Sequence, residues 1–200
     1  MAVETLENFV TPWANLSARE HDSWHSMCSY LGAFPPPLAD YFIRYFTKKG
    51  DIVFDPFAGR GTTPLQARIL NRKSIATDLN PIALALCEAK NANLTKEEIY
   101  LRIEELERKY DTSLYQQEAK AQPEEVHLIF HPRTLAQLCY LKRKILKSEN
   151  QVDKYLIGTT LGILHGGERA NGTSGYASID MPNTFSMSPE YVRRFVQTNE

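Results

Sequence analysis

The chain has 200 residues, 42% of them hydrophobic and 24% charged, which is enough apolar material for one ordinary globular domain with a core. Its formal net charge of −1 excludes a surface coated with basic residues for tight non-specific nucleic-acid binding, although it allows local basic clusters. No apolar run approaches the roughly 20 residues that a membrane span needs, and residues 1–10 contain acids where a signal peptide has basic residues. We therefore expect a cytoplasmic protein without a membrane partner.

The cysteines indicate neither a disulfide framework nor a metal centre. The chain has an odd number of cysteines, and they are widely spaced and form no CxxC pair: Cys28, Cys87 and Cys139. We predict reduced, buried thiols and no metal site.

The first 50 residues contain one predicted helix. Residues 1–34 show no clear period and are rich in aromatic residues and histidines, of which His21 and His25 are interpreted as structural residues or rim contacts. Three prolines at 35–37 force an extended approach, and a helix with apolar residues at helical spacing follows, ending near Gly50.

Residues 51–93 alternate between strand and helix patterns. Ile52–Phe54 is a short apolar run of the kind found in buried strands, and Thr62 or Thr63 can cap the helix that follows. A second strand is predicted at 74–77 and a third helix at 82–92. This order is typical of a parallel α/β sheet.

The second half of the chain is predicted to be mainly helical. We expect an amphipathic helix at 96–110, loop or frayed helix at 111–125, a short strand at 126–130, helices at 135–146, 155–164 and 189–196, and a long loop at 165–189. Basic residues gather at 142–147 and at 193–194, which we interpret first as solvated helix faces.

The strongest motif is Asp-Pro-Phe-Ala-Gly-Arg-Gly-Thr-Thr at residues 55–63, between the first strand and its helix. Glycines at this position let a ligand approach the backbone near a helix amino-terminus. The spacing differs from the GxGxxG of dinucleotide enzymes, and Asp55 would repel a pyrophosphate. An acid there suits a cationic or hydroxyl-bearing ligand, and S-adenosylmethionine has an ammonium group, a sulfonium and a ribose but no phosphate.

A second carboxylate, Asp78, follows the second predicted strand about 20 residues after the glycines, where such folds hold ribose hydroxyls. Taken alone, Asp78 fits a helix cap and Asp55 a turn residue. Two acids at strand ends, with glycines between them, favour a cofactor site.

These segments resemble the DNA methyltransferases that act on the exocyclic amine of cytosine (N4) or adenine (N6). Residues 55–63 look like the cofactor motif of that family, 77–81 like its second motif, and 30–45 like the helix that leads into the first strand. The resemblance covers residues 29–90. It implies a partial, Rossmann-like class I S-adenosylmethionine methyltransferase fold with a helical insertion or extension, and it implies DNA as the partner.

The resemblance also implies roles for individual residues. The methionine end would be held by Asp55, Phe57, Gly59 and Gly61. Asp78 would bind the ribose, and Leu79 and Pro81 would flank the adenine. Tyr30 and Phe34 would close the methionine side. The complete predicted S-adenosylmethionine site is Tyr30, Phe34, Asp55, Pro56, Phe57, Ala58, Gly59, Gly61, Thr62, Thr63, Asp78, Leu79 and Pro81.

The catalytic loop of this family is missing from the chain. Amine methylation there relies on [Asp/Asn/Ser]-Pro-Pro-[Tyr/Phe/Trp], whose aromatic ring stacks on the flipped base, and no such tetrapeptide occurs in the sequence. We therefore expect no catalytic residue in this chain and a catalytic half in cis or in trans.

The predicted segments are 1–50 with the leading helix, 51–93 as the S-adenosylmethionine-binding core, 94–165 as a helical region, and 166–200 as a loop and terminal helix. In the last segment Arg193 and Arg194 are predicted DNA contacts, against the alternative of a packed loop and helix.

Three other functions are alternatives to a restriction-modification DNA methyltransferase. A non-catalytic cofactor-binding subunit of a split methyltransferase remains open, and so does an RNA amino-methyltransferase. A nicotinamide-dependent oxidoreductase is disfavoured by the missing GxGxxG.

Overall fold

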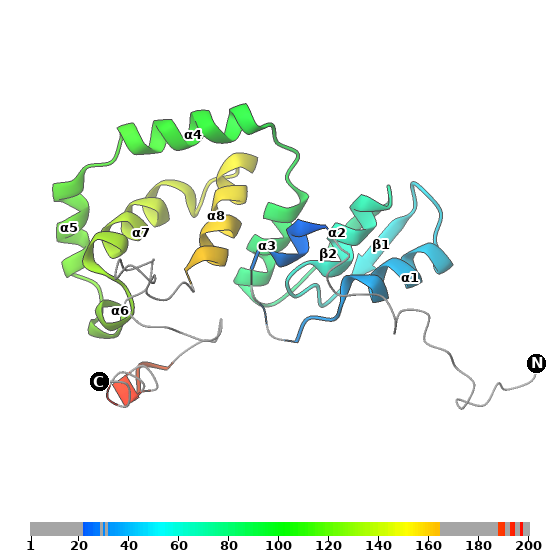
Figure 1. Ribbon diagram of the computed structural model, residues 1–200, viewed down its shortest axis with the longest axis horizontal. Coiled ribbons are helices and arrows are strands. Elements are labelled where there is room, and N and C mark those ends of the chain that lie inside the picture. Colours follow the sequence, from blue (N-terminus) through cyan, green and yellow to red (C-terminus); the bar gives the residue numbers. More distant parts are fainter. Residues whose placement is uncertain are drawn as a thin grey trace, which may run out of the picture. The chain divides into compact units, whose positions relative to one another are not determined.

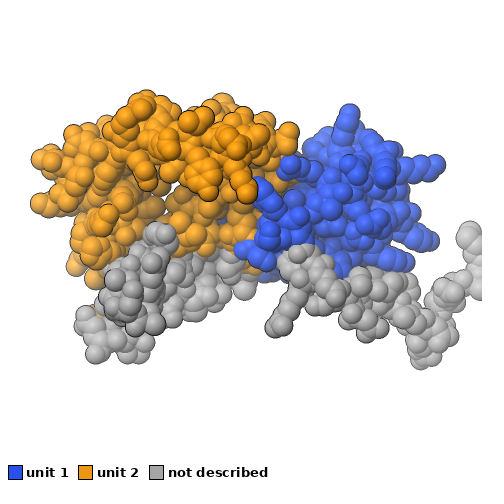
Figure 2. Space-filling view, turned by 45° about the horizontal axis from the view of Figure 1, so that its top comes forward, with its two compact units in different colours: residues 1–26, 32–87 blue, residues 27–31, 88–200 orange. Residues whose placement is uncertain are grey.

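The computed structural model describes residues 22–164 except 29 and 31, together with residues 188–190, 193, 194 and 197. The chain forms two compact units, one of residues 1–26 and 32–87 and the other of residues 27–31 and 88–200 (Figure 2). His21 and most of the predicted loop at 165–189 lie outside the described residues.

The first unit contains the predicted strand and helix order. Helix α1 spans Pro36–Phe46, strand β1 Ile52–Asp55, helix α2 Thr62–Ile69 and strand β2 Lys73–Ala76 (Figure 1). Helix α3, Pro81–Asn91, then leads the chain into the second unit. A 3₁₀ turn at Ser23–Ser26 precedes these elements.

The two strands form a parallel sheet in which Ile52 lies opposite Lys73 and Asp55 opposite Ala76. Helix α2 makes the crossover between them, as parallel strands require a long connection. The predicted parallel α/β arrangement is therefore confirmed for this unit, where the described residues contain a small sheet of two strands.

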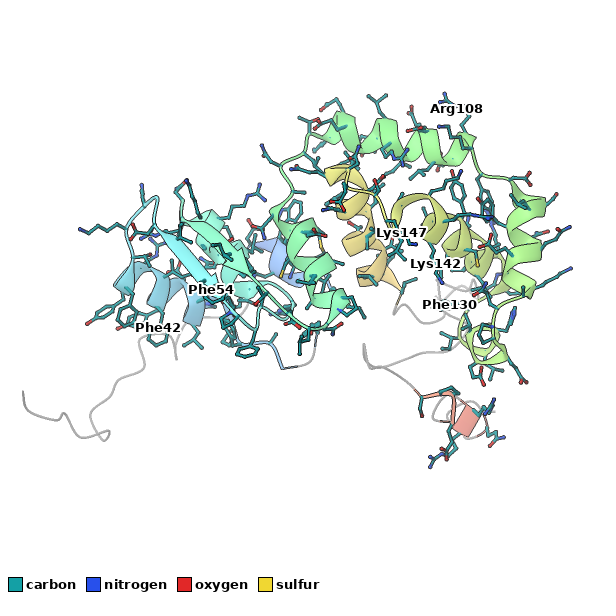
Figure 3. The ribbon with its side chains drawn as sticks, turned by 180° about the vertical axis from the view of Figure 1, so that it is seen from behind. Phe42, Phe54, Arg108, Phe130, Lys142 and Lys147 are labelled. Carbon is teal, nitrogen blue, oxygen red and sulfur yellow. The ribbon has the colours of Figure 1, made fainter. Side chains whose placement is uncertain are left out.

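One face of this sheet is covered and the other is open. Val53 packs against the small core of α1 and α2, which consists of Ala39, Ile43, Ala67 and Leu70. The side chains that alternate to the opposite face remain largely exposed: Ile52 by 60%, Phe54 by 59% and Ile75 by 53% (Phe54 is labelled in Figure 3).

The second unit is helical in the residues described. It contains α4 (Lys96–Arg108), α5 (Thr112–Lys120), α6 (Glu124–Ile129), α7 (Pro132–Ile145) and α8 (Gln151–Ile163). A capping box begins α4, since Thr95 Oγ1 accepts from Glu98 N at 3.3 Å and Glu98 Oε2 accepts from Thr95 N at 2.8 Å. The core includes Leu106, Tyr115, Leu135, Cys139 and Tyr140.

Two sequence predictions in this unit were wrong. The segment 111–125, expected as loop or frayed helix, contains the regular helix α5, because Asp111 caps it and Tyr115 and Ala119, one turn apart, are buried. The strand expected at 126–130 is largely helix α6. Val126 and Phe130, four residues apart, both pack against the core, which is helical spacing.

The described residues contain no helix that is both long and apolar enough to cross a membrane. In the same residues, no three His, Cys, Asp or Glu side chains cluster as metal ligands would. All three cysteines are buried free thiols, as predicted.

Candidate functional site

The glycine loop, residues 56–61, connects the end of β1 to the start of α2. Gly59 and Gly61 have positive φ values of 50° and 80°, and Gly61 N donates to Ala58 O at 2.8 Å. The predicted threonine cap is wrong, because Gly61 itself is the N-cap residue of α2, with no side-chain cap, and Thr62 is already helical and buried. Glycine suits this left-handed position because it lacks a Cβ atom.

The glycine loop and the segment after β2 are joined by hydrogen bonds. Ala58 N donates to Thr77 O at 3.0 Å, Gly59 N donates to Asp78 Oδ2 at 2.8 Å, and Thr77 Oγ1 donates to Pro56 O at 3.0 Å. The fold therefore brings together the two motifs that the sequence separates.

Asp78 is the central acceptor of this arrangement. Besides Gly59 N, its carboxylate accepts from Asn80 N at 2.8 Å. The N–H groups of Asn80 and Gly59, in that order of effect, lower the pKa of Asp78 below its ordinary value. Asp78 is therefore held as a carboxylate beside the glycine loop.

The helix-cap interpretation of Asp78 is wrong, because Asn80 has that role: Asn80 Oδ1 accepts from Ile82 N at 3.0 Å in the first turn of α3. The turn interpretation of Asp55 describes one of its contacts, since Asp55 Oδ1 accepts from Phe57 N at 3.0 Å. A carboxylate has about four acceptor positions. Both acids therefore retain capacity for a ligand.

Helix α3 passes close beneath the loop. A Cβ atom placed on Gly61 would lie 3.0 Å from Cys87 Sγ and 3.3 Å from Cys87 Cα. The Cys87 thiol also lies 3.8 Å from Gly59 O. Glycine at position 61 thus permits both the backbone turn and the approach of the helix.

The apolar residues predicted to contact the cofactor differ in exposure. Phe57 is 84% exposed and Leu79 is fully exposed, Ala58 is buried, and Pro81 is the first residue of α3. Phe34 and Thr63 line an apolar groove of about 330 Å³ together with residues of α1 and Val53. Tyr30 is half-buried and belongs to the second unit.

A chain of hydrogen bonds that begins at a buried histidine connects α2 with α1. His25, fully buried, lies with Nε2 3.1 Å from Gln66 Oε1, and Gln66 Nε2 donates to Asp40 Oδ1 at 2.8 Å. His25 therefore fits the structural interpretation made from the sequence. Because α1 lines the groove that contains Phe34, this chain of contacts helps to position the groove.

The two predicted DNA contacts are in ion pairs. Arg193 pairs with Glu125, and Arg194 Nη2 donates to Glu190 Oε1 at 2.8 Å. Both arginines are exposed and have helical backbone conformation, as do residues 189, 190 and 197.

Sequence reasoning missed three residues that shape the site: Thr77, Gln66 and Cys87. Only Thr77 had a local signal, since it is adjacent to Asp78. Gln66 and Cys87 act through partners 41 and 28 residues away, which no local pattern reveals.

Comparisons with known proteins agree with the motifs. Residues 4–91 match a family model described as DNA methylase. The chain is 38% identical over 66 residues to the type II methyltransferase M.MjaII of Methanocaldococcus jannaschii, which is 33% of this chain and 12% of that protein. It is 34% identical over 109 residues to the type II methyltransferase M.BsoBI of Geobacillus stearothermophilus, 54% of this chain and 20% of that protein.

A third relative is the orphan methyltransferase M.BamHII of Bacillus amyloliquefaciens, 44% identical over 61 residues, which is 30% of this chain and 22% of that protein. The chain therefore aligns with only a minor part, between 12% and 22%, of these three relatives. No solved structure matches it.

Proposed function

Since residues 4–91 match a family model described as DNA methylase, we propose that this chain is the S-adenosylmethionine-binding part of a site-specific DNA methyltransferase. The proposed target is an exocyclic amine, N4 of cytosine or N6 of adenine. The observation that supports this best is the glycine loop joined to the Asp78 carboxylate at the ends of two parallel strands.

The residues present fit the cofactor. Asp55 keeps acceptor capacity for the ammonium group, and the carboxylate of Asp78 for ribose hydroxyls. Exposed Leu79 offers apolar surface that the adenine would cover, and exposed Phe57 is proposed at the methionine end. Pro56, Ala58, Gly59, Gly61, Thr62, Thr63 and Pro81 shape the loop and the first turns of the flanking helices, while Phe34 and Tyr30 are proposed on the methionine side.

The fold proposed for the complete protein is the Rossmann-like class I methyltransferase fold, of which this chain supplies part. In the residues that the structure describes, the sheet has two strands and one open apolar face, which supports a partial fold because parallel sheets are normally covered on both faces. The relatives are several times longer than the segments they share with this chain. A catalytic half, in cis or in trans, would supply the Pro-Pro-aromatic loop.

The proposed chemistry is direct transfer of the methyl group from the bound donor to the amine nitrogen. The contribution of this chain is to hold and orient the donor, and proximity and orientation supply much of the rate in such reactions. Asp55 and Asp78 would fix the two ends of the donor, and burial of all three cysteines agrees with a reaction that needs no cysteine nucleophile.

Isothermal titration calorimetry of S-adenosylmethionine into the full chain tests the cofactor proposal. We expect a dissociation constant between micromolar and millimolar, binding abolished by Asp55→Ala and weakened by Asp78→Ala. Glu104→Ala, which removes an exposed carboxylate of α4, is the matched control and should bind like the unchanged chain.

Absence of binding by a well-folded chain would contradict the cofactor assignment. We also expect negligible DNA methylation by the chain alone. Robust methylation would contradict the proposal that its catalytic loop lies elsewhere, and methylation of RNA in preference to DNA would favour the RNA amino-methyltransferase alternative.

A further inference from the structure

The end of helix α7 has a dense group of cations. Lys142, Arg143 and Lys144 lie in its last turn and Lys147 follows just beyond its end; Figure 3 labels Lys142 and Lys147. All four side chains are exposed. Four cations within six positions are a strong local concentration in a chain whose formal net charge is −1.

Three of these four cations are not neutralised by an acid. Arg143 Nη1 lies 3.2 Å from Glu118 Oε2, but the lysines at 142, 144 and 147 form no ion pair within the part of the chain that the structure describes. Some other cations of this unit have acidic partners, since Arg102 binds Asp153 and Lys154 binds Glu88 and Glu149. What distinguishes the end of α7 is the number of exposed cations within six positions. The positive charge at the end of α7 is therefore available to an external anion.

Helix capping accounts for only part of this arrangement. Cations in the last turn of a helix are favoured by its dipole, but the effect falls off within that turn. Lys147 lies beyond the helix, after the C-cap residue Leu146. The arginines first predicted as DNA contacts, at 193 and 194, are in contrast already paired with glutamates.

We propose that Lys142, Lys144 and Lys147 form a contact surface for the phosphodiester backbone of duplex DNA. The inference rests on the proposed function, because it supplies the DNA. Lys144 and Lys147 are three positions apart, about one helical turn, whereas Lys142, two positions before Lys144, projects from another side of the helix. Duplex DNA presents one negative charge per about 1.7 Å of its axis, so long lysine side chains around the end of a helix can meet different phosphates in any sequence. Such contacts position the duplex without reading its bases.

Fluorescence anisotropy of a labelled duplex oligonucleotide, titrated with the full chain over a range of salt concentrations, tests this surface. The test variant combines Lys142→Gln, Lys144→Gln and Lys147→Gln. Each lost phosphate contact removes about 0.9 from the slope of log affinity against log salt, so the slope should become shallower by about 2.7, with affinity reduced about tenfold or more in 0.1 M salt.

A second variant is the matched control. Lys96→Gln, Arg108→Gln and Lys120→Gln remove three exposed cations from α4 and α5, and they bring the net charge from −1 to −4, as the test variant does. The control should retain the slope and nearly all the affinity. All six side chains are exposed, so circular dichroism melting curves should stay close to that of the unchanged chain.

Equal losses of DNA affinity in the test and control variants would overturn the proposal, because they would show a general effect of net charge. No DNA binding by the unchanged chain would overturn it too, as would stronger binding of single-stranded RNA through the same lysines. Calorimetry with S-adenosylmethionine separates this proposal from the proposed function: the test variant should bind the cofactor normally, whereas loss of cofactor binding in every protein would count against the proposed function alone.

Discussion

Gly61→Ala is the substitution that most directly tests the geometry of the glycine loop. Position 61 has a φ of 80°, and an added Cβ would lie 3.0 Å from Cys87 Sγ and 3.3 Å from Cys87 Cα. The first contact can relax by rotation of the thiol. The second involves the backbone of α3, so either the loop or the helix must move.

The expected cost has two parts. The left-handed backbone conformation costs alanine about 1–2 kcal/mol, and the close approach adds about 1–3 kcal/mol of overpacking. Gly50→Ala is the control for the first part, because Gly50 has a φ of 92° and no heavy atom within 4 Å of an added Cβ. Adding Cys87→Ala to Gly61→Ala should recover only part of the overpacking cost, because the contact with the Cα atom of residue 87 remains.

Urea unfolding followed by tryptophan fluorescence measures these differences, since Trp24 belongs to the first unit. We expect Gly61→Ala to lower the free energy of unfolding more than Gly50→Ala and to weaken S-adenosylmethionine binding, which Gly50→Ala should leave unchanged. Equal destabilisation by the two substitutions would refute the close approach of α3 to the loop.

Three further predictions concern the described helices and the sheet. Arg102→Met should lower the free energy of unfolding by about 3–5 kcal/mol, because it leaves the buried Asp153 carboxylate without its guanidinium partner. Urea unfolding monitored with circular dichroism measures this loss, and a small loss would contradict the burial of the ion pair. Arg102→Met combined with Asp153→Leu should recover most of the stability. The ammonium group of Lys109 and the guanidinium of Arg102 lower the pKa of Glu105 from 4.5 to about 2, so its stabilising effect is present above pH 4.5 and is lost as the pH falls toward 2. Glu105→Gln should remove that part of the pH dependence of the urea midpoint, and an identical pH profile would exclude the ion pair as its source. Phe54→Thr should change the stability of this chain by no more than about 0.5 kcal/mol, because the side chain is 59% exposed; a large loss would show that the open face of the sheet is covered.

The sequence by itself determined the elements around the glycine loop. The prolines at the start of α1, the apolar run of β1 and the helix patterns on either side of β2 are local signals. Local geometry is sufficient to place these elements within a few residues. The motif at 55–63 also indicated the resemblance to DNA methyltransferases, and residues 4–91 match a family model described as DNA methylase. Both successes concern segments whose residues act near one another along the chain.

Sequence patterns were insufficient where two interpretations shared the same spacing. Val126 and Phe130 satisfy strand alternation as well as the four-residue repeat of a helix, and packing against the core of the second unit decides for α6. Likewise, the polar segment that contains Tyr115 becomes a helix because that ring packs against Tyr110 and Tyr140. Tertiary contacts thus outweigh weak local propensity.

The tertiary structure alone decided how the candidate site is held together. Gly59 N donates a hydrogen bond to the Asp78 carboxylate, 19 residues away, and Cys87 of α3 lies close to Gly61. It likewise placed Arg193 beside Glu125, 68 residues away, while the lysines at the end of α7 have no such partner among the described residues. These facts depend on which distant segments meet in space. The sequence could therefore indicate a candidate site, whereas the hydrogen bonds and charges around it followed from the fold.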